Sequence, residues 1–135
     1  MTYRELNAAA LSARNTAYAP YSGYLVGAAL LTASGKVYTG CNVENASYGA
    51  TLCAERTAFA KAISDGEREF TALAIAGGAG DTVDGAFPPC GICRQVMAEF
   101  CSPDFAVVVV TGEESYQTYR LEDLLPHAFG ANAMS

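Results

Sequence analysis

Residues 70–110 read FTALAIAGGAGDTVDGAFPPCGICRQVMAEFCSPDFAVVVV, and this stretch decides the fold. It begins and ends with apolar runs of strand length, 70–77 and 105–110. Between them, residues 91–101 repeat apolar side chains every four positions, which is typical of a helix packed on one face. A strand, a helix and a second strand in this order predict an α/β fold with parallel strands in its sheet.

The rest of the chain adds elements on both sides of this unit. Helical spacing of Leu and Ala predicts an opening helix before the APYSG segment, and a second Ala-rich helix follows a polar loop. An SGK turn joins two β-rich runs. These elements are expected at residues 3–18 (helix), 24–33 and 37–43 (strands), 53–64 (helix) and 121–130 (a short helical turn). With no repeat or linker, we expect one domain over residues 1–135.

Composition limits the classes of function. The chain has 8 basic and 14 acidic residues, a net charge of −6, and no Lys/Arg cluster, which argues against binding to a nucleic-acid backbone. Its longest apolar runs are too short to cross a bilayer, and the N-terminus lacks a signal-peptide pattern, so we expect a cytoplasmic protein without a membrane partner. Five cysteines, an odd number, favour metal or catalytic use over a disulfide framework.

Three cysteines stand at the expected starts of two helices. Cys90 and Cys93 form a C-x-x-C step, which lets one turn present two sulfurs to a single zinc ion, and Cys53 can supply a third ligand. Cys101 lies about 12 Å farther along the helix and cannot reach the same ion. With three ligands the fourth position stays open, as in catalytic zinc sites.

Glu55 follows Cys53 by two positions. At the start of a helix it can project beside the metal from the first turn and exchange protons with a water there. The residues alone favour this catalytic site. They leave open a structural zinc site, a redox pair and an inert core as alternatives.

The sequence C-A-E at 53–55, followed by P-C-x-x-C at 89–93, resembles the zinc-dependent cytidine deaminase superfamily. Three further stretches look like its small homotetrameric members: YAPYSGYLVGAALL (18–31), GCNVENASYG (40–49) and LLPHAFG (124–130). The resemblance covers about residues 4–130 and implies a three-layer α-β-α sandwich with a mixed five-stranded sheet.

The resemblance also implies an activity. Cytidine and 2′-deoxycytidine would be deaminated hydrolytically to uridine and 2′-deoxyuridine with release of ammonia, a reaction of pyrimidine salvage. One Zn²⁺ per chain would be held by Cys53, Cys90 and Cys93. Zinc-bound hydroxide would attack C4 of the base while Glu55 shuttles protons.

Other residues acquire roles only through the resemblance. Asn42 and Glu44 match residues that hold the ribose 3′-hydroxyl, and Ala54 matches one that offers its backbone N–H to the base. Tyr24 stands where the family usually has Phe beside the nucleoside. Aromatic residues matching Tyr48 and Phe129 reach the site from neighbouring subunits, which implies a homotetramer.

Two arginines are expected near the metal. Three thiolates around Zn²⁺ sum to a charge of −1, and a positive group should offset it. The family's equivalent of Arg56 donates hydrogen bonds to the ligand sulfurs, and Arg94, next to Cys93, is expected to assist.

Two rival functions are kept. The first is a related deaminase with another substrate, above all a blasticidin-S-like aminonucleoside, because those enzymes share CAE and PCGxCRQ. The second is a non-catalytic zinc-stabilised module, which has no use for Glu55 beside the metal.

Overall fold

The computed structural model describes residues 1–85 and 87–134. The chain contains four α-helices, five strands and three short 3₁₀ turns in these residues. The elements run α1 (Tyr3–Ala13), η1 (Arg14–Thr16), β1 (Tyr24–Thr32), β2 (Val37–Cys41), η2 (Tyr48–Ala50), α2 (Ala54–Ser64), β3 (Phe70–Ala79), α3 (Gly91–Phe100), β4 (Ala106–Val110), β5 (Tyr116–Arg120), α4 (Leu121–Leu124) and η3 (Ala131–Met134).

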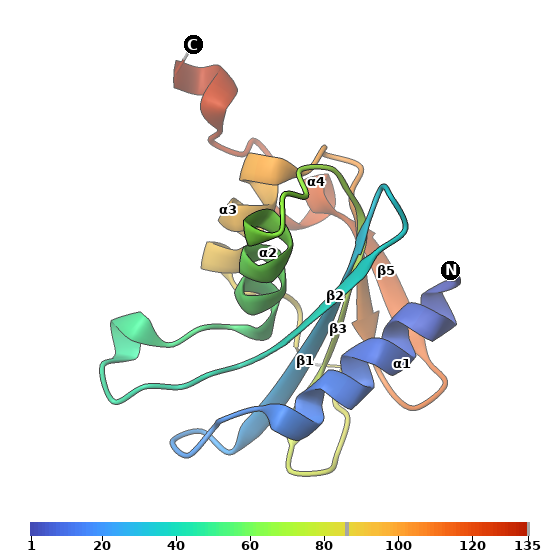
Figure 1. Ribbon diagram of the computed structural model, residues 1–135, viewed down its shortest axis with the longest axis vertical. Coiled ribbons are helices and arrows are strands. Elements are labelled where there is room, and N and C mark those ends of the chain that lie inside the picture. The colour runs from blue at the N-terminus through green and yellow to red at the C-terminus, as the bar shows by residue number, and fades with distance from the viewer. Residues whose placement is uncertain (86, 135) are drawn as a thin grey trace.

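One mixed sheet organises the molecule, with strand order β2-β1-β3-β4-β5. Strands β3 and β4 pair in parallel through the α3 crossover, as expected from residues 70–110, and the other neighbours pair antiparallel. Helix α1 covers one face of the sheet, while α2 and α3 lie side by side on the other (Figure 1). The three-layer α-β-α sandwich with a five-stranded sheet is therefore confirmed.

Alternate side chains of the central strands serve different layers. Leu73 and Ile75 of β3 pack with Val107 in the core beneath α2 and α3. Ala72 and Ala74 point to the opposite face, where they pack beneath α1. In β3, the period of two that defines a strand thus places small side chains on the α1 face and large ones on the other face.

Two glycines allow the helices to approach the sheet closely. A Cβ at Gly27 in β1 would lie 2.1 Å from the carbonyl oxygen of Ala10 in α1. A Cβ at Gly40 in β2 would lie 2.5 Å from the carbonyl oxygen of Ala54, the first residue of α2. Gly40 therefore sets how closely the start of α2, and Cys53 just before it, sits on the sheet.

The opening helix is shorter than expected. The α-helix ends at Ala13, because Arg14–Thr16 tightens into a 3₁₀ turn and Ala17 becomes extended. The extended chain then pairs Tyr18 with Val43, which the helical spacing of residues 3–18 did not anticipate. The buried Arg14 side chain donates hydrogen bonds to carbonyl oxygens in β1, in β3 and in the loop after β3.

Strand β5 was not indicated by the residue pattern, although the resemblance implied five strands. It is an edge strand whose polar side chains are largely exposed, so it carries little apolar alternation. None of the helices in the described ranges is long and apolar enough to span a membrane.

Candidate active site

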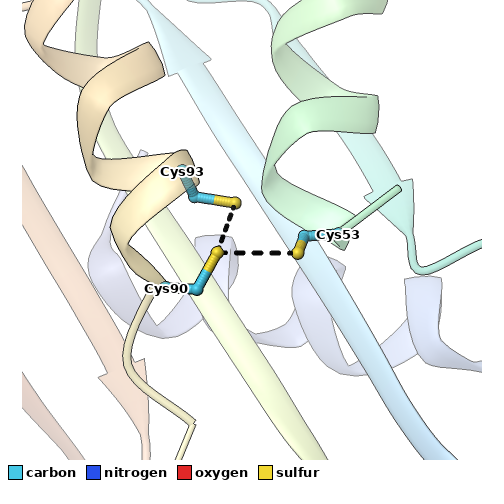
Figure 2. Close-up of side chains that lie close together, drawn as sticks. All are labelled: Cys53, Cys90 and Cys93. Atoms are coloured by element: carbon cyan, nitrogen blue, oxygen red, sulfur yellow. Dashed lines mark hydrogen bonds between the residues drawn. The ribbon is translucent and has the colours of Figure 1, made fainter. Parts of the chain in front are cut away.

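Two helices bring the three cysteines together. Cys53 is the N-cap of α2 and Cys90 the N-cap of α3, and Cys93 lies in the first turn of α3. The sulfur of Cys90 lies 3.8 Å from that of Cys53 and 3.6 Å from that of Cys93 (Figure 2). Residues 37 positions apart in the chain thus converge because α2 and α3 start at the same end of the sandwich.

The geometry of the sulfurs suits zinc. A tetrahedral zinc ion with Zn–S bonds of about 2.3 Å holds its sulfur ligands about 3.8 Å apart, close to the spacing seen here. In the part of the chain that the structure describes, these thiols form the one group of three or more potential metal ligands within 4.8 Å of one another, and it has no fourth member. Three thiols without a fourth protein ligand are the donor set of an open site.

Arg56 lies beside this cluster. Its guanidinium donates to the sulfur of Cys53 at 3.7 Å and to the carbonyl oxygen of Thr51 at 3.0 Å, and its buried Nε has no hydrogen-bond partner among the described residues. Hydrogen bonds, first from the Cys93 thiol and then from Arg56, lower the pKa of Cys53 to about 5. The surroundings of Cys53 therefore favour its thiolate, the form that binds metal, whereas the hydrogen bond to Cys53 and burial raise the pKa of the Cys93 thiol.

Glu55 is a buried carboxyl group at the same place. It lies in the first turn of α2 and is only 5% exposed. Burial, reinforced by the negative charge of Cys53, raises the pKa of Glu55 to about 7. No salt bridge within the described residues involves Glu55.

Cys53, Cys90 and Glu55 open into a cavity of about 220 Å³, whereas Cys93 is buried behind them and does not line it. Apolar side chains, among them Val26 and Ile75, form much of its wall. The expected site residues that line it are Asn42, Glu44, Cys53, Ala54, Glu55 and Cys90. Six of the residues expected from sequence are thus brought to one hollow.

Asn42 is fixed by the start of β1, and Glu44 by the loop that leads into β1. The Asn42 amide accepts a hydrogen bond from the N–H of Val26 at 2.9 Å and donates one to the carbonyl oxygen of Tyr24 at 2.8 Å. Glu44 accepts from the N–H groups of Tyr21 and Ser22 and from the Ser22 hydroxyl. The hydroxyl of Ser22 lowers the pKa of Glu44 and keeps it ionised. Ser22 was not among the residues expected from sequence.

Phe87 was missed as well. It lines the cavity and packs against Tyr24, with ring centroids 5.4 Å apart. A Cβ at Gly77 of β3 would lie 2.8 Å from the ring, so the ring needs a glycine beneath it. Tyr24 itself is 47% exposed at this edge. The one sequence signal was an aromatic residue directly before the Pro-Pro-Cys turn.

Three expected residues lie elsewhere. Tyr48 and Phe129 are 80% and 62% exposed and do not line the cavity. Arg94 donates to the carbonyl oxygens of Pro89, just before Cys90, and of Leu124 in α4. Arg94 therefore holds the turn that carries Cys90 in place by a hydrogen bond to the backbone of that turn.

Comparisons with known proteins point the same way. Residues 1–111 match the family described as cytidine and deoxycytidylate deaminase zinc-binding region. A cytidine deaminase from Sporosarcina psychrophila is 47% identical over 135 residues, covering 100% of this chain and 96% of that protein. The crystal structure of cytidine deaminase from Burkholderia pseudomallei is 50% identical, with a TM-score of 0.87 over 96% of this chain and 100% of that one. A blasticidin-S deaminase from Bacillus cereus is 30% identical over 111 residues, 79% of this chain and 78% of that protein.

Proposed function

The chain belongs to the cytidine and deoxycytidylate deaminase zinc-binding family, and on this basis we propose that it deaminates cytidine and 2′-deoxycytidine hydrolytically, releasing ammonia. The observation that carries the proposal is the cavity itself. It joins two of the three clustered thiols, those of Cys53 and Cys90, a buried carboxyl group and two polar residues in one hollow.

Cys53, Cys90 and Cys93 would hold the zinc ion, because the distances between their sulfurs are close to those between the sulfur ligands of a tetrahedral zinc ion. When bound, zinc supplies a Lewis acid that lowers the pKa of water toward neutrality. Glu55, shielded from solvent, would take a proton from the attacking water and deliver it to N3 of the pyrimidine. It would then take the remaining proton of the hydroxyl group on C4 and give it to the amino nitrogen, so that the C4–N bond breaks, ammonia leaves and C4 keeps a carbonyl oxygen.

The polar groups at the cavity favour an uncharged sugar. Glu44 is held ionised, and Asn42 keeps one amide hydrogen free after its two contacts with β1. Both suit a ribose hydroxyl, and the N–H of Ala54 at the start of α2 suits the base. Among the described residues that line the cavity there is no Lys or Arg to pair with a phosphate. A nucleoside is therefore favoured over a nucleotide.

Assembly would complete the site. Tyr48 and Phe129 are large, exposed and outside the cavity of their own chain, which supports a homotetramer in which they reach neighbouring sites. One sheet forms the central layer, and the helices on both of its faces pack against it, which supports a single domain. The cytoplasmic location stays a prediction, supported by five free thiols that suit a reducing compartment.

The test is an ultraviolet assay of the purified, metal-analysed protein with cytidine, run beside Glu55→Gln. The wild type should turn cytosine into uracil, whereas Glu55→Gln should lose at least about 10²–10⁴-fold in rate while keeping one zinc per chain. Zinc without turnover of cytidine or deoxycytidine, but with turnover of blasticidin S, would transfer the proposal to the aminonucleoside deaminases. Absence of zinc from the folded protein would overturn the assignment of the cysteines.

A further inference from the structure

The segment 125–130, here called the C-terminal arm, carries Phe129 away from the body of the fold. Residues 126–129 are all exposed. Pro126 has no N–H to donate, and His127 adopts a left-handed backbone with φ of 54°, which residues other than glycine hold only when contacts impose it. The arm therefore needs specific contacts to keep one conformation.

Packing against the core holds Leu125 at the start of the arm, whereas residues 126–129 are exposed. A groove of about 480 Å³ lies between residues of the arm and those of α3 and α4, so the arm stands off the body along part of its length. The C-terminal end of the chain projects from the sandwich near α3 (Figure 1). The exposed part of the arm therefore depends on hydrogen bonds from α3 to keep one conformation.

Two consecutive residues of α3 make such bonds. Gln95 donates from its amide Nε2 to the carbonyl oxygen of Phe129 at 2.8 Å. Arg94 donates from Nη1 to the carbonyl oxygen of Leu124 at 2.6 Å and from Nε to that of Pro89 at 2.7 Å. Arg94 thus holds both the turn before Cys90 and the end of α4, just before the arm. The side-chain hydrogen bond that Gln95 makes among the described residues goes to the arm.

From these contacts we infer that Gln95 is a positioning residue, which fixes the backbone of Phe129 so that its ring can complete the substrate site of a neighbouring chain. The inference rests on the proposed function of Phe129 in a shared site. Gln95 itself does not line the cavity, so it acts through the arm. Its loss should weaken substrate binding and leave the chemistry at the metal intact.

The experiment is a double-mutant cycle on the full-length zinc enzyme with cytidine as substrate. Gln95→Ala should raise KM about three- to tenfold, as expected for one lost hydrogen bond, with kcat and zinc content unchanged. In the Phe129→Ala background, the same substitution should change KM by less than about twofold, because its effect passes through Phe129. Gln95→Glu, which cannot donate the bond, should behave like Gln95→Ala. Gln117→Glu on β5 makes the same chemical change at an exposed glutamine and should leave KM unaltered.

The outcomes separate the two ideas. An unchanged KM in Phe129→Ala would contradict the part of the proposed function in which Phe129 completes the site of a neighbouring chain. A raised KM in Phe129→Ala with an unchanged KM in Gln95→Ala overturns the role of Gln95 alone. Additive effects in the double variant, or a KM defect of Gln95→Ala that disappears as protein concentration promotes assembly, assign Gln95 to stability or subunit contact instead.

Discussion

Helix α1 and the two cysteine-bearing helices begin in different ways. The N-cap of α1 is Thr2, whose hydroxyl accepts from the N–H of Glu5 at 3.2 Å while the Glu5 carboxylate accepts from the N–H of Thr2 at 3.3 Å. Helices α2 and α3 begin with Cys53 and Cys90, and neither side chain makes a capping hydrogen bond. In place of capping, the two sulfurs face each other.

The difference separates stability from chemistry. A capping side chain is worth about 1 kcal/mol to a helix, and α2 and α3 forgo it at the positions where metal ligands are required. Tertiary packing holds these helices in place, through Ala58 and Phe59 of α2 and Met97 of α3, all of which are buried. The start of α1, by contrast, is exposed and depends on local hydrogen bonds.

Replacing Cys90 by a capping residue should show most strongly that this position serves metal binding at the expense of helix capping. Both Cys90→Ser and Cys90→Ala should lose nearly all zinc and activity, because two thiols remain for the metal. The backbone of Cys90, with φ of −69° and ψ of 171°, suits an N-cap, so metal-free Cys90→Ser should be about 1 kcal/mol more stable than metal-free Cys90→Ala. Zinc analysis and urea unfolding measure the two effects. Equal stability of the apo variants would mean that α3 gains nothing from a cap.

Gly40→Ala should disturb the start of α2 through the backbone. The new Cβ would lie 2.5 Å from the carbonyl oxygen of Ala54 and 2.6 Å from the N–H nitrogen of Ala58. Overpacking of this kind costs about 1–3 kcal/mol, and contact with backbone favours the upper end. Gly27→Ala creates a comparable clash with α1 and serves as the matched control.

Urea unfolding of the apo proteins and zinc affinity of the folded fraction separate these two glycines. Both substitutions should lower stability, but only Gly40→Ala should also weaken zinc binding, since it shifts the helix that carries Cys53. Equal zinc affinities in the two variants would mean that Gly40 has no influence on the metal site.

Arg56→Ala should weaken the metal centre by about 10–100-fold in activity or zinc retention. The guanidinium offsets the negative charge of the thiolates and donates to Cys53. The rate at which a chelator removes zinc is the direct measurement. Arg68→Ala is the control and should match the wild type, because among the described residues Arg68 donates only to the carbonyl oxygens of Ile63 in the last turn of α2 and of Glu67 after it, far from the start of the helix.

Much of this site could be predicted because its chemistry is local in sequence. The C-x-x-C step and the Cys-Ala-Glu step each lie within one helical turn, so their spacing makes these side chains candidates for a metal site, and the resemblance to a known family joins the two steps. The strand–helix–strand order of residues 70–110 predicts the parallel pair of β3 and β4. The common end where α2 and α3 begin is seen only in the structure.

What escaped prediction depends on contacts between distant segments. Phe87 enters the cavity wall because Gly77 of β3 leaves room for its ring, and no local pattern joins those positions. Arg14 is buried against carbonyl groups as far away as Thr82, although arginine is rarely found inside proteins. Strand β5 is an exposed edge whose polar residues hide the alternation that marks a strand.

The smallest expected effect returns to α1. Thr2→Ala removes the hydroxyl that caps the helix and should lower the free energy of unfolding by about 1 kcal/mol, measured by urea denaturation. Activity and zinc content should not change, because Thr2 is exposed and α1 covers the face of the sheet opposite the cysteines. Thr2→Ser keeps the hydroxyl and should retain most of the stability. A loss of activity without a loss of stability in Thr2→Ala would contradict the separation of capping from chemistry, because it would tie the first helix to the metal site on the far side of the sheet.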